Sequence, residues 1–202
     1  MSSAREAAAG AVASTLAAIA GEIAACRACD LAAGRTMTVP GAGSPAARLV
    51  LVGEAPGAGE DAAGVPFVGA SGRLLDRLLE QAGLHRAEAF VLNSVKCRPP
   101  ENRDPRPAEL AACRPFLARQ LAVLRPVVVA TLGRHALNVF AQTAQIARTH
   151  GAPYVGETEL LPPGTVLFPL YHPAATIYDR RLRPLLEQDL AALAALLERG
   201  AR

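Results

Sequence analysis

The sequence lacks features that would assign it to several large classes of protein. No apolar run reaches the roughly 18 residues needed to cross a bilayer. Residues 1–26 carry Arg5, Glu6 and Glu22 within an alanine-rich helical pattern, without the basic start and purely apolar stretch of a secretory signal. We therefore expect an N-terminal helix, a cytoplasmic protein and no membrane partner, with a cleaved signal sequence as the alternative.

Lysine is almost missing, since Lys96 is the only lysine among 21 basic residues. The rest are arginines, whose planar guanidinium group suits phosphate. A high-G+C codon bias also explains them, and the net charge is only +3. Internal repeats, low-complexity linkers and signs of a second domain are missing too. A chain of 202 residues with 51% hydrophobic content is long enough for one domain, residues 1–202, without disulfide bonds. We expect the N-terminal helix and the cysteine pair, at residues 10–30, to pack against its core. We expect a monomer.

Phosphate-binding fingerprints are absent as well. The glycine-rich segment 52–76 has neither the Gly-Lys-Ser/Thr of a Walker loop nor G-x-G-x-x-G. It does place Glu54 at the end of an apolar run and Phe67 in a loop between Pro66 and Gly69. A loop phenylalanine is usually a packing residue. Beside a glutamate and glycines, it is also a candidate for stacking on a ligand.

Four short apolar runs predict buried strands, and segments with helical spacing separate them. The runs are residues 48–52, 90–95, 127–132 and 166–171. The helical segments are residues 71–83, 108–124, 134–142 and 183–200. Ser71 is the expected N-cap of the first helix, and Pro115 is expected to kink or split the second. Strands that alternate with helices predict a parallel sheet covered on both faces.

The segments at the carboxyl ends of the four runs carry the polar and special residues. They read "GEAPG", "NSVKCRPP", "GRH" and "YHP". Ligands of such sheets bind beyond the carboxyl ends of the strands. The sequence therefore predicts a site at this one edge.

The chain has four cysteines, of which Cys26 and Cys29 form a C-x2-C pair and Cys97 and Cys113 are widely spaced. A C-x2-C pair places two sulfurs on one metal. A disulfide is disfavoured in the expected compartment. Four thiolates serve either zinc or an iron–sulfur cluster, and the spacing leaves both open.

The motifs taken together resemble a known family. "GEAPGAGEDAAGVPFVGASGRLLD", "LNSVKCRPPENRDP" and "YHPAA", with the four cysteines in this order, are similar to the family 4 uracil-DNA glycosylases of bacteria and archaea. The resemblance runs from about Cys26 to Tyr178. It implies a three-layer α/β/α fold with a short central parallel sheet of about four strands, a structural [4Fe-4S] cluster and removal of uracil from DNA. It favours the cluster over zinc.

The resemblance also implies roles for individual residues. The expected catalytic residues are Glu54, Asn93 and His172. The expected uracil-binding residues are Glu54, Ala55, Pro56, Phe67, Asn93 and His172. Glu60 and Asn102 match further polar positions of the family. The expected contacts to the DNA backbone are Lys96, Arg98, Arg103 and Ser71. The expected cluster ligands are Cys26, Cys29, Cys97 and Cys113.

Some residues depart from the family pattern. Related enzymes have an aspartate at the position of Ala55, which cannot act as a base, so Glu54 is left to orient the water. The alternative is that no strong base is needed, because the sugar is already highly reactive once the glycosidic bond has lengthened. Bacterial members of the family have a leucine pair after the "HP" motif, which inserts into the duplex as a wedge. This chain reads "HPAATIYDRR" there, which leaves Ile177 or Tyr178 for that role. Because no lysine other than Lys96 lies in a site motif, we expect a monofunctional enzyme without lyase activity. The alternatives are a related glycosylase that attacks hypoxanthine or G-paired lesions, and a non-catalytic metal-containing module that binds nucleic acid.

Overall fold

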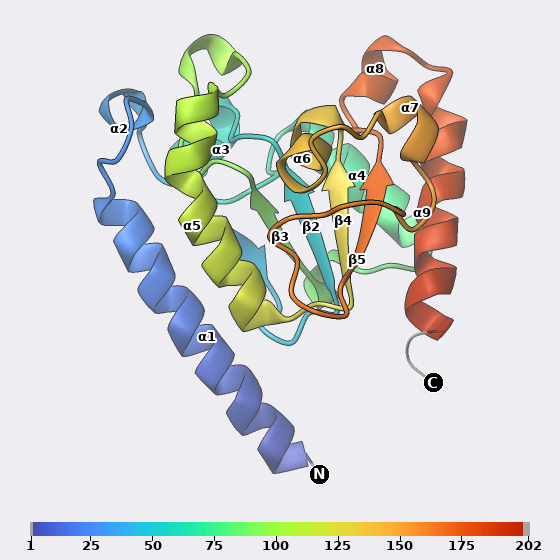
Figure 1. The fold of residues 1–202 in the computed structure, drawn as a ribbon, viewed down its shortest axis with the longest axis horizontal. Helices are drawn as coiled ribbons and strands as arrows, with labels where there is room; N and C mark the ends of the chain where they lie inside the picture. Colours follow the sequence, from blue (N-terminus) through green and yellow to red (C-terminus); the bar gives the residue numbers. More distant parts are fainter. Residues whose placement is uncertain (1, 200–202) are drawn as a thin grey trace.

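The structure, a computed structural model, describes residues 2–199 (Figure 1). One sheet has the strand order β1-β3-β2-β4-β5. Its strands are β1 (Ala42–Gly43), β2 (Leu49–Gly53), β3 (Ala89–Asn93), β4 (Val128–Leu132) and β5 (Val166–Leu170). Strands β2 to β5 pair in parallel, which confirms the four predicted strands. The two-residue β1 pairs antiparallel with β3 and was not predicted.

The helices connect the strands and cover the sheet. They are α1 (Ser2–Ala25), α2 (Leu31–Gly34), α3 (Ala58–Ala63), α4 (Ala70–Gln81), α5 (Pro107–Leu124), α6 (Arg134–Phe140), α7 (Ile146–Thr149), α8 (Ala175–Tyr178) and α9 (Leu182–Arg199). Two short 3-10 helices, η1 (Arg86–Glu88) and η2 (Pro100–Asn102), flank β3. The four predicted helical segments correspond to α4, α5, α6 and α9. The short helices were not predicted.

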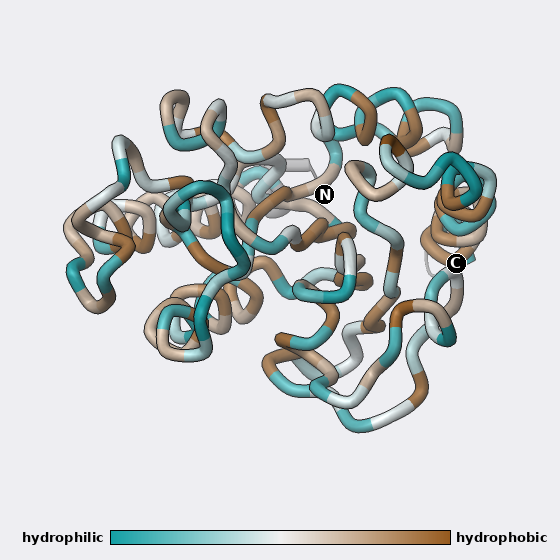
Figure 2. Tube along the Cα trace, turned by 90° about the horizontal axis from the view of Figure 1, so that it is seen from above, coloured by the Kyte–Doolittle hydropathy of each residue, from teal (hydrophilic) through white to brown (hydrophobic). Residues whose placement is uncertain are grey.

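Two hydrophobic cores lie on opposite faces of the sheet. One packs alternate strand residues, such as Leu51 and Val91, against leucines of α4 and α9. The other packs their neighbours, such as Val52 and Leu92, against α1, α5 and α6. This arrangement is the three-layer α/β/α architecture that the sequence predicted. In Figure 2, hydrophilic stretches colour many of the peripheral loops, and hydrophobic stretches run through the interior.

The predicted N-cap of α4 was wrong, and of the two outcomes predicted for Pro115, a kink or a split, the split was wrong. Gly69, with an extended backbone, is the N-cap of α4, and Ser71 lies inside that helix. Pro115 does not split α5, which runs unbroken from Pro107 to Leu124. The carboxylate of Glu60 accepts a hydrogen bond from the Gly69 N–H, so the start of α4 is fixed by a residue nine positions upstream.

The expected N-terminal helix is α1, and it is more apolar than its charged residues suggested. Its segment Glu6–Ala25 is long and apolar enough to cross a membrane by length and composition. A single helix of this kind near an N-terminus is weak evidence of a span, because signal sequences and core helices share these properties. In this structure α1 packs along α5, and it buries Leu16, Ile19 and Ile23 (Figure 1).

Candidate active site and cysteine site

Two of the predicted uracil-binding side chains meet at Gly53, the last residue of β2. A methyl group added at Gly53 would lie 2.3 Å from Oδ1 of Asn93 and 2.8 Å from two ring carbons of Phe67. The Phe67 ring centroid is 5.9 Å from that of His172, which follows β5. The structure therefore brings Phe67, Asn93 and His172 together at the carboxyl edge of the sheet. Gly53 leaves the space between Phe67 and Asn93, and its role was not predicted.

Asn93, the last residue of β3, is only 2% exposed. Its Oδ1 is buried and has no hydrogen-bond partner among the described residues. An unpartnered buried acceptor costs about 1–3 kcal/mol. Such an atom beside an aromatic ring suits a planar ligand that brings its own N–H donor.

The Phe67 backbone is held in an unusual conformation. Its φ is +56°, in the left-handed region that bulky residues rarely adopt. Gly72 accommodates this backbone, since a Cβ there would lie 1.7 Å from the Phe67 carbonyl oxygen. The guanidinium of Arg86 donates to the carbonyls of Phe67 and Pro66 and to the Asp76 carboxylate. Arg86 thus braces the loop that presents the ring, although no sequence motif pointed to it.

The imidazole of His172 has a defined tautomer. Its Nδ1 accepts a hydrogen bond of 3.1 Å from the Ala174 N–H, so the ring proton of a neutral imidazole is on Nε2. Burial lowers the pKa of His172 to about 4. At neutral pH the ring is therefore an uncharged N–H donor. Gly133 permits this packing, because an added Cβ would lie 3.0 Å from Cβ of His172.

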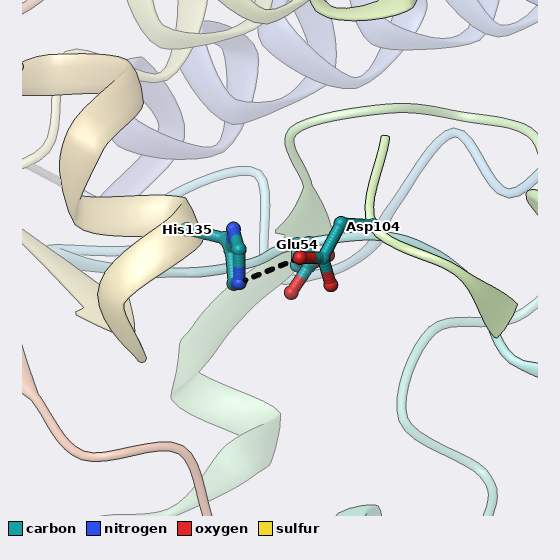
Figure 3. Close-up of side chains that lie close together, drawn as sticks. All are labelled: Glu54, Asp104 and His135. Atoms are coloured by element: carbon teal, nitrogen blue, oxygen red, sulfur yellow. Dashed lines mark ion pairs between the residues drawn. The ribbon is translucent and has the colours of Figure 1, made fainter. Parts of the chain in front are cut away.

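Glu54 follows Gly53, and its carboxylate lies in a second group of polar side chains, with Asp104 and His135 (Figure 3). One carboxylate oxygen from each acid and one ring nitrogen of His135 all lie within 4.8 Å of one another. Nε2 of His135 is 3.3 Å from Oδ2 of Asp104. Burial, and then the charge of Asp104, raise the pKa of Glu54 to about 7. Neither Asp104 nor His135 was predicted to belong to the site.

This group borders a cavity of about 430 Å³ between α5 and α6. Glu54, Ser94 and His135 are among its lining residues. The cavity lies at the layer of α5 and α6, whereas Phe67 belongs to the core that contains α4 and α9. The edge of the sheet thus carries two neighbouring groups of side chains, joined at the Gly53–Glu54 peptide.

The remaining predicted pocket residues have structural surroundings. Glu60 accepts hydrogen bonds from the N–H groups of Gly57 and Gly69, so it ties together both ends of the loop that carries Phe67. Pro56 is buried. Ala55 packs against a small core that contains Cys97 and Cys113.

The predicted contacts to the DNA backbone are only partly available. Lys96 is 1% exposed and donates from Nζ to the Asn93 carbonyl at 2.8 Å, so the prediction that it faces phosphate was wrong. Arg103 forms a two-point ion pair with Glu109, at 2.6 and 2.9 Å, and is not free as predicted.

The other two predicted backbone contacts lie nearer the surface. Arg98 donates to Oδ1 of Asn102, which is itself exposed at the surface. Ser71 is partly exposed in the first turn of α4. Ile177 and Tyr178, the predicted wedge residues, are 53% and 90% exposed on α8.

The four cysteines line one small cavity between α1, α2, the loop after β3 and α5. We call Cys26, Cys29, Cys97 and Cys113 the cysteine site. Nη1 of Arg35 donates to Sγ of Cys97 at 3.2 Å. Burial raises the pKa of Cys97, and it raises that of Cys113 to about 11. These thiols are therefore costly to ionise unless a cation binds them.

Known proteins match the sequence of this chain. A profile described as the Uracil DNA glycosylase superfamily matches residues 40–195. The chain belongs to the uracil-DNA glycosylase superfamily. A "Type-4 uracil-DNA glycosylase" of Sulfurisphaera tokodaii is 42% identical over 184 residues, with 87% of this chain and 81% of the relative covered. Another of that name, from Archaeoglobus fulgidus, is 43% identical, with 87% and 89% covered. A "Type-5 uracil-DNA glycosylase" of Thermus thermophilus is 37% identical, with 66% and 68% covered.

These matches confirm the resemblance drawn from the motifs. Within the superfamily, the chain groups with the type-4 relatives, which match it over more of its length than the type-5 relative does. The matched region of the superfamily profile includes Gly53, Phe67, Asn93 and His172. Two of the four cysteines, Cys26 and Cys29, precede that region.

Proposed function

We propose that this chain is a monofunctional uracil-DNA glycosylase, which hydrolyses the N-glycosidic bond of a flipped-out deoxyuridine and leaves an abasic site. The buried and unpartnered Oδ1 of Asn93 beside the Phe67 ring carries this proposal. The names of the type-4 relatives support it. A glycosylase cannot reach its bond inside the duplex, so it spends a few kcal/mol on unstacking the nucleotide.

Phe67 and Asn93 divide the recognition of uracil between them. Stacking on the Phe67 ring offsets part of the unstacking energy, since base stacking on an aromatic side chain contributes about 1–3 kcal/mol. Oδ1 of Asn93 accepts from uracil N3–H, and its amide nitrogen donates to O4. Cytosine presents the opposite pattern at both atoms, which would leave buried polar groups unpaired. Glu54, Ala55 and Pro56 form the backbone wall beside the base.

His172 supplies a donor for the departing base. Its neutral Nε2–H donates to uracil O2, where negative charge grows as the glycosidic bond lengthens. A donor that strengthens in the transition state raises the rate. The attacking water is oriented by Glu54, whose carboxyl group titrates near neutral pH. Ala55 has no acid–base group, so it contributes only its backbone.

The cysteine site fits a structural [4Fe-4S] cluster. A tetrahedral zinc ion with Zn–S bonds of about 2.3 Å needs its sulfurs about 3.8 Å apart. Within residues 2–199, no three of these sulfur atoms lie within 4.8 Å of one another. Wider spacing suits a four-iron cluster, which contacts each thiolate at a separate corner. When bound, the cluster would join α1 and α2 to the loop after β3 and to α5.

The DNA would lie over the loops at the carboxyl edge of the sheet. Tyr178 or Ile177, exposed on α8 just after His172, would wedge into the duplex. Arg98, Asn102 and Ser71 remain for contacts along the backbone. The only lysine is buried, which supports hydrolysis without a lyase step. We further propose that the enzyme acts as a monomer in the cytoplasm, on single- or double-stranded DNA.

One assay tests the proposal directly. Purified protein is incubated with oligonucleotides that contain one uracil, thymine or hypoxanthine, and abasic sites are then cleaved with alkali. We expect strand breaks only with uracil. Binding without breaks would refute the enzymatic proposal. Breaks at hypoxanthine would favour the broader-specificity alternative. Iron and acid-labile sulfide assays distinguish the cluster from zinc.

A further inference from the structure

The only lysine of the chain lies between the active site and the cysteine site. Lys96 is 1% exposed, and its Nζ donates to the carbonyl oxygen of Asn93 at 2.8 Å. Along the same chain segment, the N–H of Ser94 donates to the Gly53 carbonyl and that of Val95 to the Glu54 carbonyl. The Lys96 side chain therefore adds one more hydrogen bond to a segment whose backbone already links the ends of β2 and β3.

On its other side, Lys96 lines the cavity of the cysteine site. Cys97 and Cys113 line the same cavity. Arg35 donates to Cys97 from across the same cavity. Four thiolates carry net negative charge even when bound to iron, so N–H donors around them are stabilised. Lys96 thus contacts both the cysteine site and the peptide of Asn93.

We propose that Lys96 is a positioning residue, whose buried amino group fastens the Asn93 peptide to the cysteine site so that the uracil-reading amide and the thiolates form one rigid unit. The inference rests on the proposed function for the identity of the base. Lys96 touches neither the base nor the reacting bond, so it acts only through Asn93. A buried long side chain with a polar end costs free energy to place in the core. Methionine would fill the same volume without a donor.

The test compares Lys96→Met with Arg77→Met in the iron-loaded protein. Arg77 is exposed on α4, outside the site, and serves as the matched control. Free uracil is used as the probe, through its inhibition constant, alongside single-turnover excision and iron content. Without this hydrogen bond the Asn93 peptide can shift and weaken one contact to the base, and a loss of about 1.4 kcal/mol in binding corresponds to tenfold. We expect Lys96→Met to keep its iron, bind uracil about tenfold more weakly and discriminate less against cytosine. Arg77→Met should match the wild type.

A purely structural role would give a different pattern. It would lower the melting temperature or the iron content of Lys96→Met, while the folded, iron-loaded fraction kept the wild-type uracil affinity. That result would overturn the inference. If the wild-type protein neither releases nor binds uracil, the proposed function fails instead.

A second measurement needs no variant. Because the chain has one lysine, mass spectrometry after reductive methylation reports on Lys96 and the N-terminal amine alone. In the native iron-loaded protein we expect Lys96 to stay unmodified and to react once iron is chelated. Rapid modification of Lys96 in the native protein would also overturn the inference, even if Lys96→Met fails to fold.

Discussion

Replacing Gly53 with alanine tests the geometry of the site where Phe67 and Asn93 meet. The added Cβ would lie 2.3 Å from Oδ1 of Asn93 and 2.8 Å from Cε2 and Cζ of Phe67. The φ of Gly53 is not in the left-handed region, so alanine introduces no backbone strain there. Any effect of Gly53→Ala therefore comes from displacement of the two side chains that recognise the base.

The expected magnitude follows from these distances. Non-bonded heavy atoms settle near 3.5 Å, so the Asn93 amide must move by about 1 Å. Hydrogen bonds to uracil tolerate only about 2.7–3.2 Å. Losing one and leaving a buried group unpaired costs about 1–3 kcal/mol, which is roughly 5- to 150-fold in kcat/KM. Crowding the site should also cost about 1–3 kcal/mol of folding stability.

Single-turnover excision from a uracil oligonucleotide, measured below the melting temperature of each variant, separates the two effects. Gly59→Ala is the matched control, because its added Cβ would make only an ordinary contact of 3.7 Å with Val68. Gly59 lies in α3, where alanine is preferred over glycine by about 1 kcal/mol. We expect Gly59→Ala to excise uracil at the wild-type rate.

A stable, folded Gly53→Ala protein with wild-type kcat/KM would refute the reasoning. It would mean that Asn93 and Phe67 have room to move without loss of recognition. A change in the thymine-to-uracil ratio alone, without slower excision of uracil, would point instead to the backbone of Glu54, Ala55 and Pro56, which we expect to exclude the C5 methyl group of thymine.

Three further predictions follow from the site. Because the pKa of Glu54 is raised to about 7 from its ordinary 4.5, the folded state binds the extra proton, and stability falls as pH rises through this window. Glu54→Gln should therefore gain melting temperature relative to wild type at pH 8 and not at pH 4.5; an equal gain at both would contradict the shift. His172→Ala should slow single-turnover excision at least tenfold, since it removes the donor to O2, with little change in melting temperature; unfolding of the variant would contradict a catalytic role. Arg86→Gln should weaken inhibition by free uracil several-fold, because the Phe67 loop loses its brace; an unchanged inhibition constant would show that Gly72 alone holds the loop.

The sequence predicted those parts of the fold that local pattern determines. The continuous apolar runs that became β2, β3, β4 and β5 are typical of strands buried on both faces, and polar residues at their ends marked the correct edge. Strand β1 escaped prediction because its two residues, Ala42 and Gly43, have no apolar pattern. Its pairing depends on tertiary contact with β3.

The site was predictable only where a motif carried it. Asp104 and His135 come from different elements, and only folding brings them to Glu54. Lys96 was assigned to phosphate because a lysine in an arginine-rich loop is normally exposed. Its burial depends on the segments that carry Cys26, Cys29 and Cys113, which are not its neighbours in the sequence. The role of Arg86 has no sequence motif, because an arginine at any nearby position could donate to the carbonyl groups of the Phe67 loop.

The placement of the cysteines has a consequence for biosynthesis. Cys26 and Cys29 leave the ribosome before any strand of the sheet, whereas Cys113 lies midway along α5. Domains fold as their segments emerge during synthesis. If the four thiolates hold one cluster, the cysteine site can close only after β3 and the first half of α5, up to Cys113, have been synthesised. The supply of iron at that moment would then decide whether α1 packs against the rest of the nascent domain.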